Sequence, residues 1–272
     1  MQLNARTTLC CVIGNPVEHS LSPTIHNAGY EAMGLNYAYF AFRVNNLQDA
    51  IMGVRALGIK GVSVTAPHKL TAMQFLDRID DRAENIGAVN SILNQDGELI
   101  GYNTDCEGAI KALEEKTTLS GKKVVLLGAG GAARAIAFGL REKNADVLIL
   151  NRTPEKAAGL AKVTNARFGD LSMLDEIKTS DILINATSAD ISSGDNERLI
   201  PKEMLHENLI VFDIIYNPQE TQLILEAKKT GCEILYGYKM LLYQAVLQFE
   251  LFTGLVAPVS TMEKALLKNL QT

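Results

Sequence analysis

Hydrophobic segments of strand length alternate with helical patterns along the first part of the chain. Apolar runs that predict strands occupy residues 9–13, 37–42, 61–65, 88–93 and 98–102. The last two runs flank Asn94-Gln95-Asp96-Gly97, which is typical of a hairpin turn. Pro23 suits the first turn of a helix over 23–33 and Gly34 suits its C-terminal cap, while apolar residues recur at helical spacing within 47–58. We expect another helix to begin near Pro67. The pattern predicts an α/β domain.

The second part of the chain repeats this alternation more regularly. Strands are expected at 124–127, 147–150, 181–186, 209–214 and 232–235, with helices between them. A helix from Thr104 precedes this series, and the tail from Met240 is helical. Alternating strands and helices predict a parallel sheet that is covered by helices on both faces. We therefore expect two α/β domains.

A glycine-rich turn follows the strand expected at 124–127. Gly128 allows a tight turn, Gly130 lets the backbone approach a pyrophosphate, and Ala133 supplies the small third residue of the G-x-G-x-x-G/A pattern. The helix that follows would present its free N–H groups to the phosphates. An ordinary strand–helix turn can also carry glycines, but the second strand at 147–150 favours a Rossmann-type dinucleotide-binding domain.

The end of that second strand indicates which dinucleotide is bound. A site for NAD usually places Asp or Glu about 20 residues past the first glycine, whereas this chain has Asn151-Arg152-Thr153 there. An Arg suits a ribose 2′-phosphate because its guanidinium makes forked hydrogen bonds to phosphate oxygens. Lys156 could add charge, and the alternative is that Arg152 is a solvated surface residue. The position favours NADP.

Composition excludes several classes of protein. The 272 residues are 47% hydrophobic and 21% charged, as in soluble globular proteins. A net charge of −5 argues against nucleic acid or an anionic membrane as the main partner. The cysteines (Cys10, Cys11, Cys106 and Cys232) lack the spacing of a metal or dithiol site, so we expect reduced structural thiols and no metal. We see no signal peptide and no apolar run of membrane-spanning length, which predicts a cytoplasmic protein.

Polar clusters at strand ends are the candidates for chemistry. Ser20 and Ser22 flank a helix start and could bind an anion such as a carboxylate, although Ser22 before Pro23 also suits a simple N-cap. Lys69 follows a strand near an expected helix start, where a cation is disfavoured, which hints at a function. The alternative for Lys69 is a solvated surface side chain.

Asn90 and Asp105 form a further cluster. Asp105 lies in the expected first turn of a helix, where the helix dipole stabilises a carboxylate, and this alone could explain it. The functional alternative is that Asp105 pairs with Lys69. Such a pair could manage the proton that accompanies hydride transfer to a ketone.

Motifs along nearly the whole chain resemble those of the shikimate dehydrogenase family. They are the segments 14–23 with His26-Asn27, 64–69, 87–90, 101–105, 128–133, 151–153, 213–218, and Gln244 with Phe249-Glu250-Leu251. The resemblance implies a substrate-binding domain of residues 1–103 and 238–272, with the C-terminal helices returning to the first domain. It implies an NADP-binding Rossmann domain of residues 104–237.

The resemblance also implies an activity and its residues. The reaction would be the reversible NADPH-dependent reduction of 3-dehydroshikimate to shikimate, in aromatic amino-acid biosynthesis. Lys69 and Asp105 would form the catalytic pair. The substrate would be bound by Ser20, Ser22, Thr65, Asn90, Tyr216 and Gln244. The cofactor would be bound by Gly128, Ala129, Gly130, Gly131, Ala132, Asn151, Arg152, Thr153, Lys156, Thr187, Ile214 and Gly237. We expect a monomer or a homodimer.

Five residues depart from the family pattern. Ser63 stands where Asn is usual, Ser91 where Thr is usual, Ala189-Asp190 where Gly-Met is usual, and Lys239 where Gly is usual. The alternatives are a quinate/shikimate dehydrogenase and a non-catalytic ligand-binding paralogue. Lys69 and Asp105 favour an enzyme, and the two serines of the N-terminal motif favour shikimate over quinate.

Overall fold

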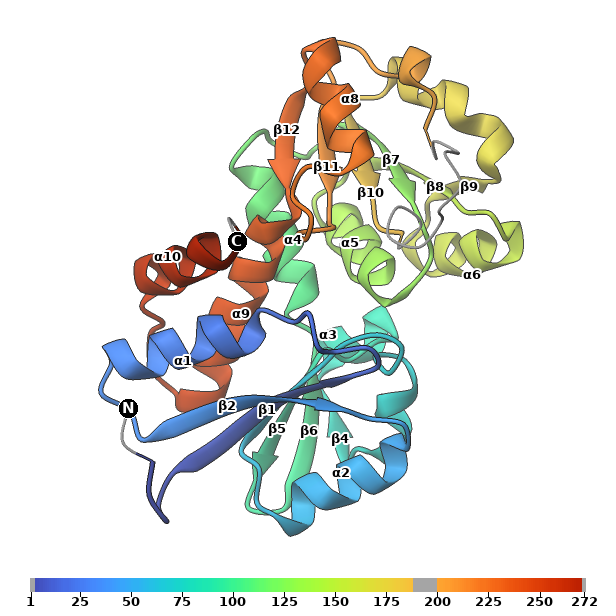
Figure 1. The fold of residues 1–272 in the computed structure, drawn as a ribbon. Coiled ribbons are helices and arrows are strands. Elements are labelled where there is room, and N and C mark those ends of the chain that lie inside the picture. The colour runs from blue at the N-terminus through green and yellow to red at the C-terminus, as the bar shows by residue number, and fades with distance from the viewer. Residues whose placement is uncertain (1–2, 188–199, 271–272) are drawn as a thin grey trace. The chain divides into compact units, whose positions relative to one another are not determined.

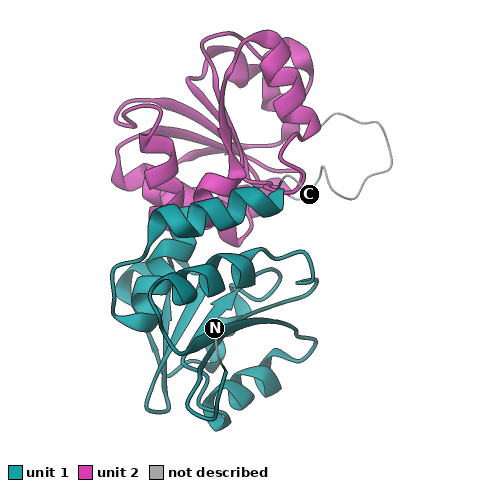
Figure 2. Cartoon of the chain, turned by 60° about the vertical axis from the view of Figure 1, so that its left-hand side comes forward, with its two compact units in different colours: residues 1–105, 242–272 teal, residues 106–241 magenta. Residues whose placement is uncertain are grey.

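The protein divides into two compact units. The computed structural model describes residues 3–187 and 200–270. One unit contains residues 1–105 and 242–272, and the other contains residues 106–241 (Figure 2). The chain passes between them at the start of α4 (Asp105–Glu114) and within α9 (Gly237–Thr253).

The first unit is built on a mixed six-stranded sheet in the order β2-β1-β3-β5-β6-β4 (Figure 1). Its strands are β1 (Thr8–Gly14), β2 (Tyr37–Arg43), β3 (Gly61–Val64), β4 (Arg78–Ile79), β5 (Ser91–Gln95) and β6 (Glu98–Tyr102). β5 is antiparallel to both neighbours, and the other pairs are parallel. Asp96 and Gly97, both at positive φ, close the β5–β6 hairpin as predicted.

Helices cover both faces of this sheet. Adjacent cysteines of β1 point to opposite sides: Cys11 packs with α2 (Leu47–Ala56), while Cys10 lies beside Tyr30 of α1 (Ser22–Ala32). On the side of α1, α10 (Val259–Leu270) packs against α1, and Tyr30 contacts Phe249 of α9. The C-terminal helices therefore return to the first unit, as predicted. The unit also contains α3 (Asp81–Ile86) and the short 3-10 helix η1 (Thr71–Phe75).

The second unit has a fully parallel six-stranded sheet. Its strands are β7 (Lys123–Leu127), β8 (Asp146–Leu150), β9 (Arg167–Gly169), β10 (Ile182–Asn185), β11 (Ile210–Asp213) and β12 (Glu233–Tyr236). The spatial order β9-β8-β7-β10-β11-β12 is that of a doubly wound dinucleotide-binding sheet, with the switch point between β7 and β10. Ligands of such sheets bind outside the carboxyl ends of the strands at this point.

The helices of the second unit also lie on both faces of its sheet. One face packs against α8 (Gln222–Thr230) and the 3-10 helix η2 (Leu171–Thr179). The remaining helices are α5 (Gly131–Glu142), α6 (Pro154–Thr164) and the 3-10 helix η3 (Lys202–Met204). The predicted fold class, two α/β domains with the second of Rossmann type, is confirmed.

Local expectations were wrong at a few points. No α-helix begins near Pro67, where the chain turns and continues into η1. The two- and three-residue strands β4 and β9 were not predicted, because so short a run shows no periodicity. Within the part of the chain that the structure describes, no helix is both long and apolar enough to cross a bilayer.

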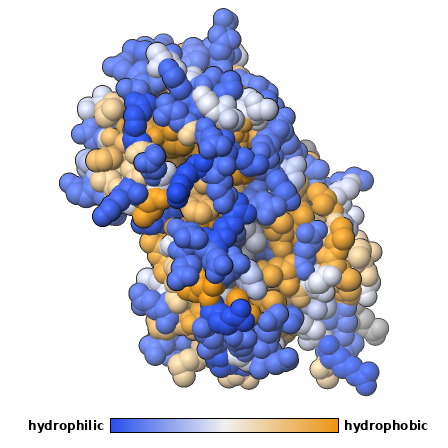
Figure 3. Space-filling model, turned by 180° about the vertical axis from the view of Figure 1, so that it is seen from behind, coloured by the Kyte–Doolittle hydropathy of each residue, from blue (hydrophilic) through white to orange (hydrophobic). Residues whose placement is uncertain are grey.

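Apolar side chains also reach the surface. On the face shown in Figure 3, hydrophobic residues appear in several places among hydrophilic ones. Phe40 and Phe42 of the edge strand β2 remain about half exposed, with their ring centroids 6.4 Å apart. The main chain of this edge strand is partly satisfied from outside the sheet, because Asn27 of α1 bonds both the N–H and the carbonyl of Tyr39.

Candidate active site

Lys69 and Asp105 form a buried ion pair in the first unit. Lys69 lies in the turn after β3, and Asp105 is the first residue of α4. Lys69 Nζ is 2.6 Å from Asp105 Oδ2, and the side chains are 17% and 5% exposed. A charge pair in a low-dielectric setting is only weakly screened by solvent. Since no α-helix begins beside Lys69, this partner explains its position better than the predicted conflict with a helix dipole.

Two amide side chains extend the pair. Asn90 Nδ2 donates to Asp105 Oδ1 at 2.9 Å and to Thr104 Oγ1 at 3.0 Å. Gln244 Oε1, from α9, lies 3.5 Å from the same nitrogen. Asn90 and Gln244 are 2% and 7% exposed. Four of the predicted site residues therefore meet in one cluster, and they come from the turn after β3, the position before β5, the start of α4 and the helix α9.

The topology of the sheet explains why these residues meet. β5 runs against both β3 and β6, so the start of β5 lies beside the carboxyl ends of its two neighbours. Asn90 directly precedes β5, while Lys69 follows β3 and Asp105 follows β6. The inserted antiparallel strand thus brings together side chains from segments well separated in sequence.

The predicted substrate residues Ser20, Ser22 and Thr65 lie beyond β1 and β3, two parallel neighbours in the sheet. Thr65 is so close to Gly14 that a Cβ on Gly14 would collide with its methyl group. Helix α1 begins at Ser22 itself, and the cap position, Leu21, makes no side-chain cap hydrogen bond. The interpretation of Ser22 as a simple N-cap is therefore wrong, and its hydroxyl is not used to cap the helix.

A buried network of side-chain hydrogen bonds, which the sequence did not predict, lies behind this cluster. Gln248, one helical turn after Gln244 on α9, bonds both Ser63 and Ser91. Ser63 and Ser91 are the two positions that depart from the family pattern near the cluster. The i, i+4 spacing of the two glutamines was the available signal, because residues four apart share one helix face. His68, the neighbour of Lys69 in the chain, is buried and its ring contacts the carbonyl of Val44, so it suits a structural role.

The glycine turn of the second unit has the geometry of a phosphate loop. Gly128 has φ +110°, and a Cβ there would lie 2.8 Å from the carbonyl oxygen of Ala186, so only glycine fits. Gly130 is the cap residue of α5, and no side chain caps the helix. Apart from its chain neighbours, a Cβ on Gly130 would have no atom of the described residues within 4 Å. Helix α5 begins at Gly131 and includes Ala132. Its free N–H groups, and the open space before them, fit a pyrophosphate.

The predicted 2′-phosphate residues follow β8, at the same end of the sheet. Arg152, Thr153 and Lys156 are exposed. Asn151 donates from Nδ2 to the carbonyl of Thr153 at 2.8 Å, which folds this turn. Within the described residues, the side chains of Arg152 and Lys156 make no hydrogen bond or ion pair, so both cations are available to an anion.

Loops beyond β10 and β11 hold the other predicted cofactor residues. Thr187 donates from its backbone N and its Oγ1 to Asn185 Oδ1, at 3.1 and 2.7 Å. Asn185 in turn donates to Asp213, which is fully buried and accepts from the N–H of Ile215, just after Ile214. The backbone of Gly237 packs directly on the carbonyl of Ile214, so a Cβ at Gly237 would collide with it. Ala129 directly follows Gly128 in the turn.

Tyr216 and Lys239 also belong to the second unit. Tyr216 follows β11, and burial raises the pKa of its phenol. Lys239, which departs from the family pattern, lies 3.3 Å from the carboxylate of Glu115 and 5.8 Å from the ring centroid of Tyr238. Its charge is thus neutralised within the unit. The other departure, Ala189-Asp190, lies outside the described residues.

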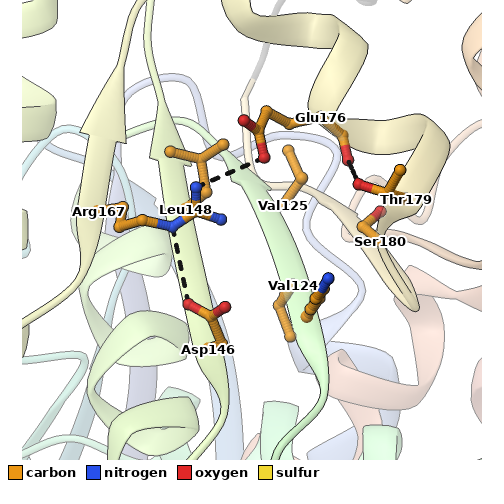
Figure 4. Close-up of a pocket in the computed structure, with 9 residues that line it drawn as sticks. Val124, Val125, Asp146, Leu148, Arg167, Glu176, Thr179 and Ser180 are labelled. Carbon is orange, nitrogen blue, oxygen red and sulfur yellow. Dashed lines mark hydrogen bonds and ion pairs between the residues drawn. The ribbon is translucent and has the colours of Figure 1, made fainter.

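A pocket of about 290 Å³ lies at the amino ends of the strands of the second sheet, opposite the glycine turn (Figure 4). Lys123 and Asp146, which begin β7 and β8, belong to its lining. Arg167 lies across it within 3.8 Å of Asp146 and 3.5 Å of Glu176. Because the charges are paired with one another and the pocket lies at the amino ends of the strands, it does not compete with the glycine turn as the dinucleotide site.

With a phosphate loop in one unit and an acid–base pair in the other, the protein falls in the class of α/β oxidoreductases that bind a dinucleotide. Family models narrow the class. Residues 12–92 match the shikimate dehydrogenase substrate binding domain, residues 110–224 match shikimate / quinate 5-dehydrogenase, and residues 237–267 match the shikimate 5'-dehydrogenase C-terminal domain. The chain belongs to the shikimate dehydrogenase family.

Individual relatives agree over nearly the full length. The chain is 47% identical to shikimate dehydrogenase (NADP(+)) of Methanobrevibacter smithii, covering 98% of this chain and 99% of the relative. A solved shikimate dehydrogenase in complex with NADP+ superposes with a TM-score of 0.93 at 42% identity, covering 100% and 98% of the two chains. The shikimate 5-dehydrogenase of Thermus thermophilus, solved with NADP(H) and shikimate, gives a TM-score of 0.87 at 36% identity, with 96% and 99% covered.

Proposed function

We propose that this protein catalyses the reversible, NADP-dependent interconversion of 3-dehydroshikimate and shikimate, a step of aromatic amino-acid biosynthesis. The observation that carries the proposal is the Lys69–Asp105 ion pair, which lies at the ends of the central strands of the first sheet. Asn90 donates a hydrogen bond to Asp105 and lies beside Gln244. A cluster of one cation, one carboxylate and two amides is suited to a small substrate that bears several hydroxyls and one reacting carbonyl.

Lys69 is the residue that stabilises negative charge on the ketone oxygen of the substrate. When bound, NADPH supplies the hydride that reduces the ketone carbon. The ammonium group of Lys69 stabilises the negative charge that develops on oxygen and can donate a proton to it. Asp105 orients Lys69 through their 2.6 Å contact and accepts a hydrogen bond from a neighbouring hydroxyl of the substrate. Asn90, Gln244 and Thr65 bind the remaining ring hydroxyls.

The substrate carboxylate binds to the hydroxyls of Ser20 and Ser22. Ser20 Oγ accepts from the backbone N–H of Ser22 at 3.3 Å, which holds the two hydroxyl-bearing residues together at the start of α1. The N-terminus of this helix adds a favourable electrostatic field for an anion. Tyr216, which follows β11, stays a predicted substrate residue.

The cofactor binds at the carboxyl edge of the second sheet. The N-terminus of α5 holds the pyrophosphate, and Arg152 with Lys156 holds the 2′-phosphate, because both cations are exposed and free of partners within the described residues. Thr187, Ile214 and Gly237 line the nicotinamide end. We assign substrate binding to the first unit, residues 1–105 and 242–272, and cofactor binding to the second unit, residues 106–241.

We also propose a cytoplasmic location and a monomer or homodimer. The free cysteines Cys10, Cys11, Cys106 and Cys232 are buried thiols, as in proteins of a reducing compartment. Burial raises the pKa of Cys10 to about 11, so this thiol stays protonated and unreactive at neutral pH.

Steady-state assays test the function. We expect NADP+ to be reduced with shikimate and much less with quinate, and NAD+ to be the poorer acceptor. Equal activity with quinate would instead indicate a quinate/shikimate dehydrogenase. No reduction with either substrate, combined with measurable binding of shikimate by calorimetry, would indicate a non-catalytic binding protein and refute the proposal.

A further inference from the structure

An unbroken chain of hydrogen bonds leads from the core of the first unit to Asp105. Tyr39 OH donates to Ser63 Oγ at 2.5 Å, and Ser63 Oγ donates to Gln248 Oε1 at 2.7 Å. Gln248 Nε2 donates to Ser91 Oγ at 2.9 Å, and Ser91 Oγ donates to Asn90 Oδ1 at 2.8 Å. Asn90 Nδ2 then donates to Asp105 Oδ1 at 2.9 Å. Every group donates in the same direction. Hydrogen bonds aligned in this way polarise one another.

Gln248 is the link between helix and sheet in this chain. Its side chain extends from α9, it is only 1% exposed, and both ends of its amide are satisfied. Besides Ser91, its Nε2 also donates to the main-chain carbonyl of Asn90 at 3.2 Å. A buried amide is costly unless its donors and acceptors are paired. The pairing at both ends leaves Gln248 a single favourable orientation.

The contacts of Gln248 define the orientation of Asn90. Because Ser91 Oγ accepts a hydrogen bond from Gln248, its own proton is directed to Asn90 Oδ1. The backbone N–H of Thr104 donates to the same oxygen at 2.8 Å. With its oxygen occupied in this way, the amide of Asn90 presents its NH₂ group to Asp105. Gln248 is therefore linked to Asp105 by hydrogen bonds through the side chains of Ser91 and Asn90.

We propose that Gln248 is a positioning residue of the active site, which acts through Ser91 and the main chain of Asn90 to aim the Asn90 amide at Asp105. This inference rests on the proposed function for its kinetic test. Without Gln248, the Ser91 hydroxyl is free to rotate and one anchor of the Asn90 main chain is lost. The substrate-binding geometry then loosens, although Gln248 itself does not touch the substrate.

Gln248→Met tests the proposal, because methionine has a similar length and no hydrogen-bonding amide. Loss of a directing hydrogen bond should lower kcat/KM for shikimate by about threefold to tenfold. The Kd for NADP+, measured by fluorescence titration, should not change. A merely structural loss would lower Tm and the active fraction but leave KM for shikimate unaltered; that outcome would overturn the proposal.

Ser91 and Ser63 provide matched variants. Ser91→Ala should lower kcat/KM in the same direction as Gln248→Met, and the double variant should cost no more than Gln248→Met alone, because the Ser91 link is part of what Gln248→Met removes. Ser91→Thr, which keeps the hydroxyl, should retain activity. Ser63→Ala removes the bond at the other end of the Gln248 amide, so it should lower Tm with kcat/KM for shikimate unchanged. Equal kinetic losses in Ser63→Ala and Gln248→Met would show that the effect is not directed through Ser91.

A second measurement is independent of turnover. The side-chain amide NMR signals of Asn90 should shift in Gln248→Met and keep their positions in Ser63→Ala. Should the unmodified protein fail to oxidise shikimate, the proposed function would fall, and the Asn90 signals would still decide the positioning role. Unchanged Asn90 signals in Gln248→Met would refute it.

Discussion

Single polar side chains, most of them buried, make up the candidate active site of the first unit. The side chains of Lys69, Asn90 and Asp105 have defined partners, and each partner comes from a different element. Groups held in this way need little reorganisation when charge develops in a transition state, which is the main source of electrostatic catalysis. Residue-scale predictions therefore concern rate and charge more than stability.

Lys69→Ala should reduce kcat strongly while KM for shikimate changes little. Positioned acid–base catalysis contributes about 10²–10⁴ in rate, and steady-state assays of NADPH formation would measure the loss. Since Lys69 and Asp105 act as a unit, adding Asp105→Asn should cost much less than the product of the single losses. Near-normal kcat in Lys69→Ala would exclude Lys69 from the mechanism.

Arg152→Ala should weaken NADPH binding and leave NADH binding nearly unchanged. A hydrogen bond to a charged group contributes about 1.5–3 kcal/mol, or roughly tenfold to a hundredfold in affinity. Titration of cofactor fluorescence measures both constants. Equal losses for the two cofactors would contradict the assignment of Arg152 to the 2′-phosphate.

His26 should make the protein less stable in mild acid. Its ring is fully buried and stacks on Tyr39 at 4.3 Å, with Tyr30 at 6.0 Å. Burial lowers its pKa from 6.5 to about 3, against a smaller opposing effect of Gln248. The unfolded chain binds the proton more readily, so this stability is complete above pH 6.5 and is lost as the pH falls towards 3.

The loss attributable to His26 between pH 7 and pH 5 amounts to about 2 kcal/mol. In His26→Leu, urea unfolding at these two pH values should show a smaller difference than in the unmodified protein. The exposed His19 provides the control, since His19→Leu should keep the full pH dependence. The same pH dependence in both variants would contradict the buried, neutral state of His26.

At the scale of elements, side chains and glycines determine how helices meet their sheets. Asn27 of α1 exchanges two hydrogen bonds of 2.9 Å with the main chain of Tyr39, so a side chain holds the helix to the edge strand β2. In the second unit, Gly139 of α5 lets α4 approach closely. A Cβ there would lie 2.5 Å from Ile110 Cγ1 and 3.1 Å from Cys106 Sγ.

Two glycine substitutions in neighbouring helices should therefore have opposite effects. Gly139→Ala should destabilise the second unit by about 1–3 kcal/mol, because the added methyl overpacks the α4–α5 contact. Gly159→Ala in α6, where a Cβ would meet nothing within 4 Å, should stabilise it by about 0.5–1 kcal/mol through helix propensity. Thermal unfolding of both variants measures the difference, and the same sign of effect in both would contradict the packing argument.

At the scale of the whole molecule, the protein consists of two units with separate sheets. One is a mixed sheet with an inserted antiparallel strand, and the other is a fully parallel doubly wound sheet. Each has its own core and its own row of candidate residues at strand ends. A ligand should accordingly protect the unit that binds it.

Hydrogen exchange should show this division. NADP+ at about 100 times its Kd stabilises the bound state by about 2.7 kcal/mol, and exchange should slow within 128–133 and 151–156. Shikimate should slow exchange within 64–69 and 101–105. Protection by NADP+ confined to the shikimate segments would contradict the assignment of cofactor to the second unit.

Local features of the sequence were sufficient for most elements and for the phosphate loop. Hydrophobic periodicity and glycine position depend on residues that are close in the chain, so Gly128 and Gly130 could be assigned to a turn before any fold was known. Lys69 and Asp105 could be named as a candidate pair, but their 2.6 Å contact could not be derived from spacing. The resemblance to a family, and not periodicity, indicated the substrate.

The sequence by itself determined the alternation of strands and helices, the dinucleotide turn and the lack of a carboxylate in Asn151-Arg152-Thr153 after β8, because these depend on local spacing and residue type. Only the tertiary structure decided the strand orders, the start of α1 at Ser22 and the network behind Asn90. Gln248 is 185 residues from Ser63 and 157 from Ser91 along the chain. Such contacts depend on sheet register and on how α9 packs against β3 and β5, and no local pattern specifies either.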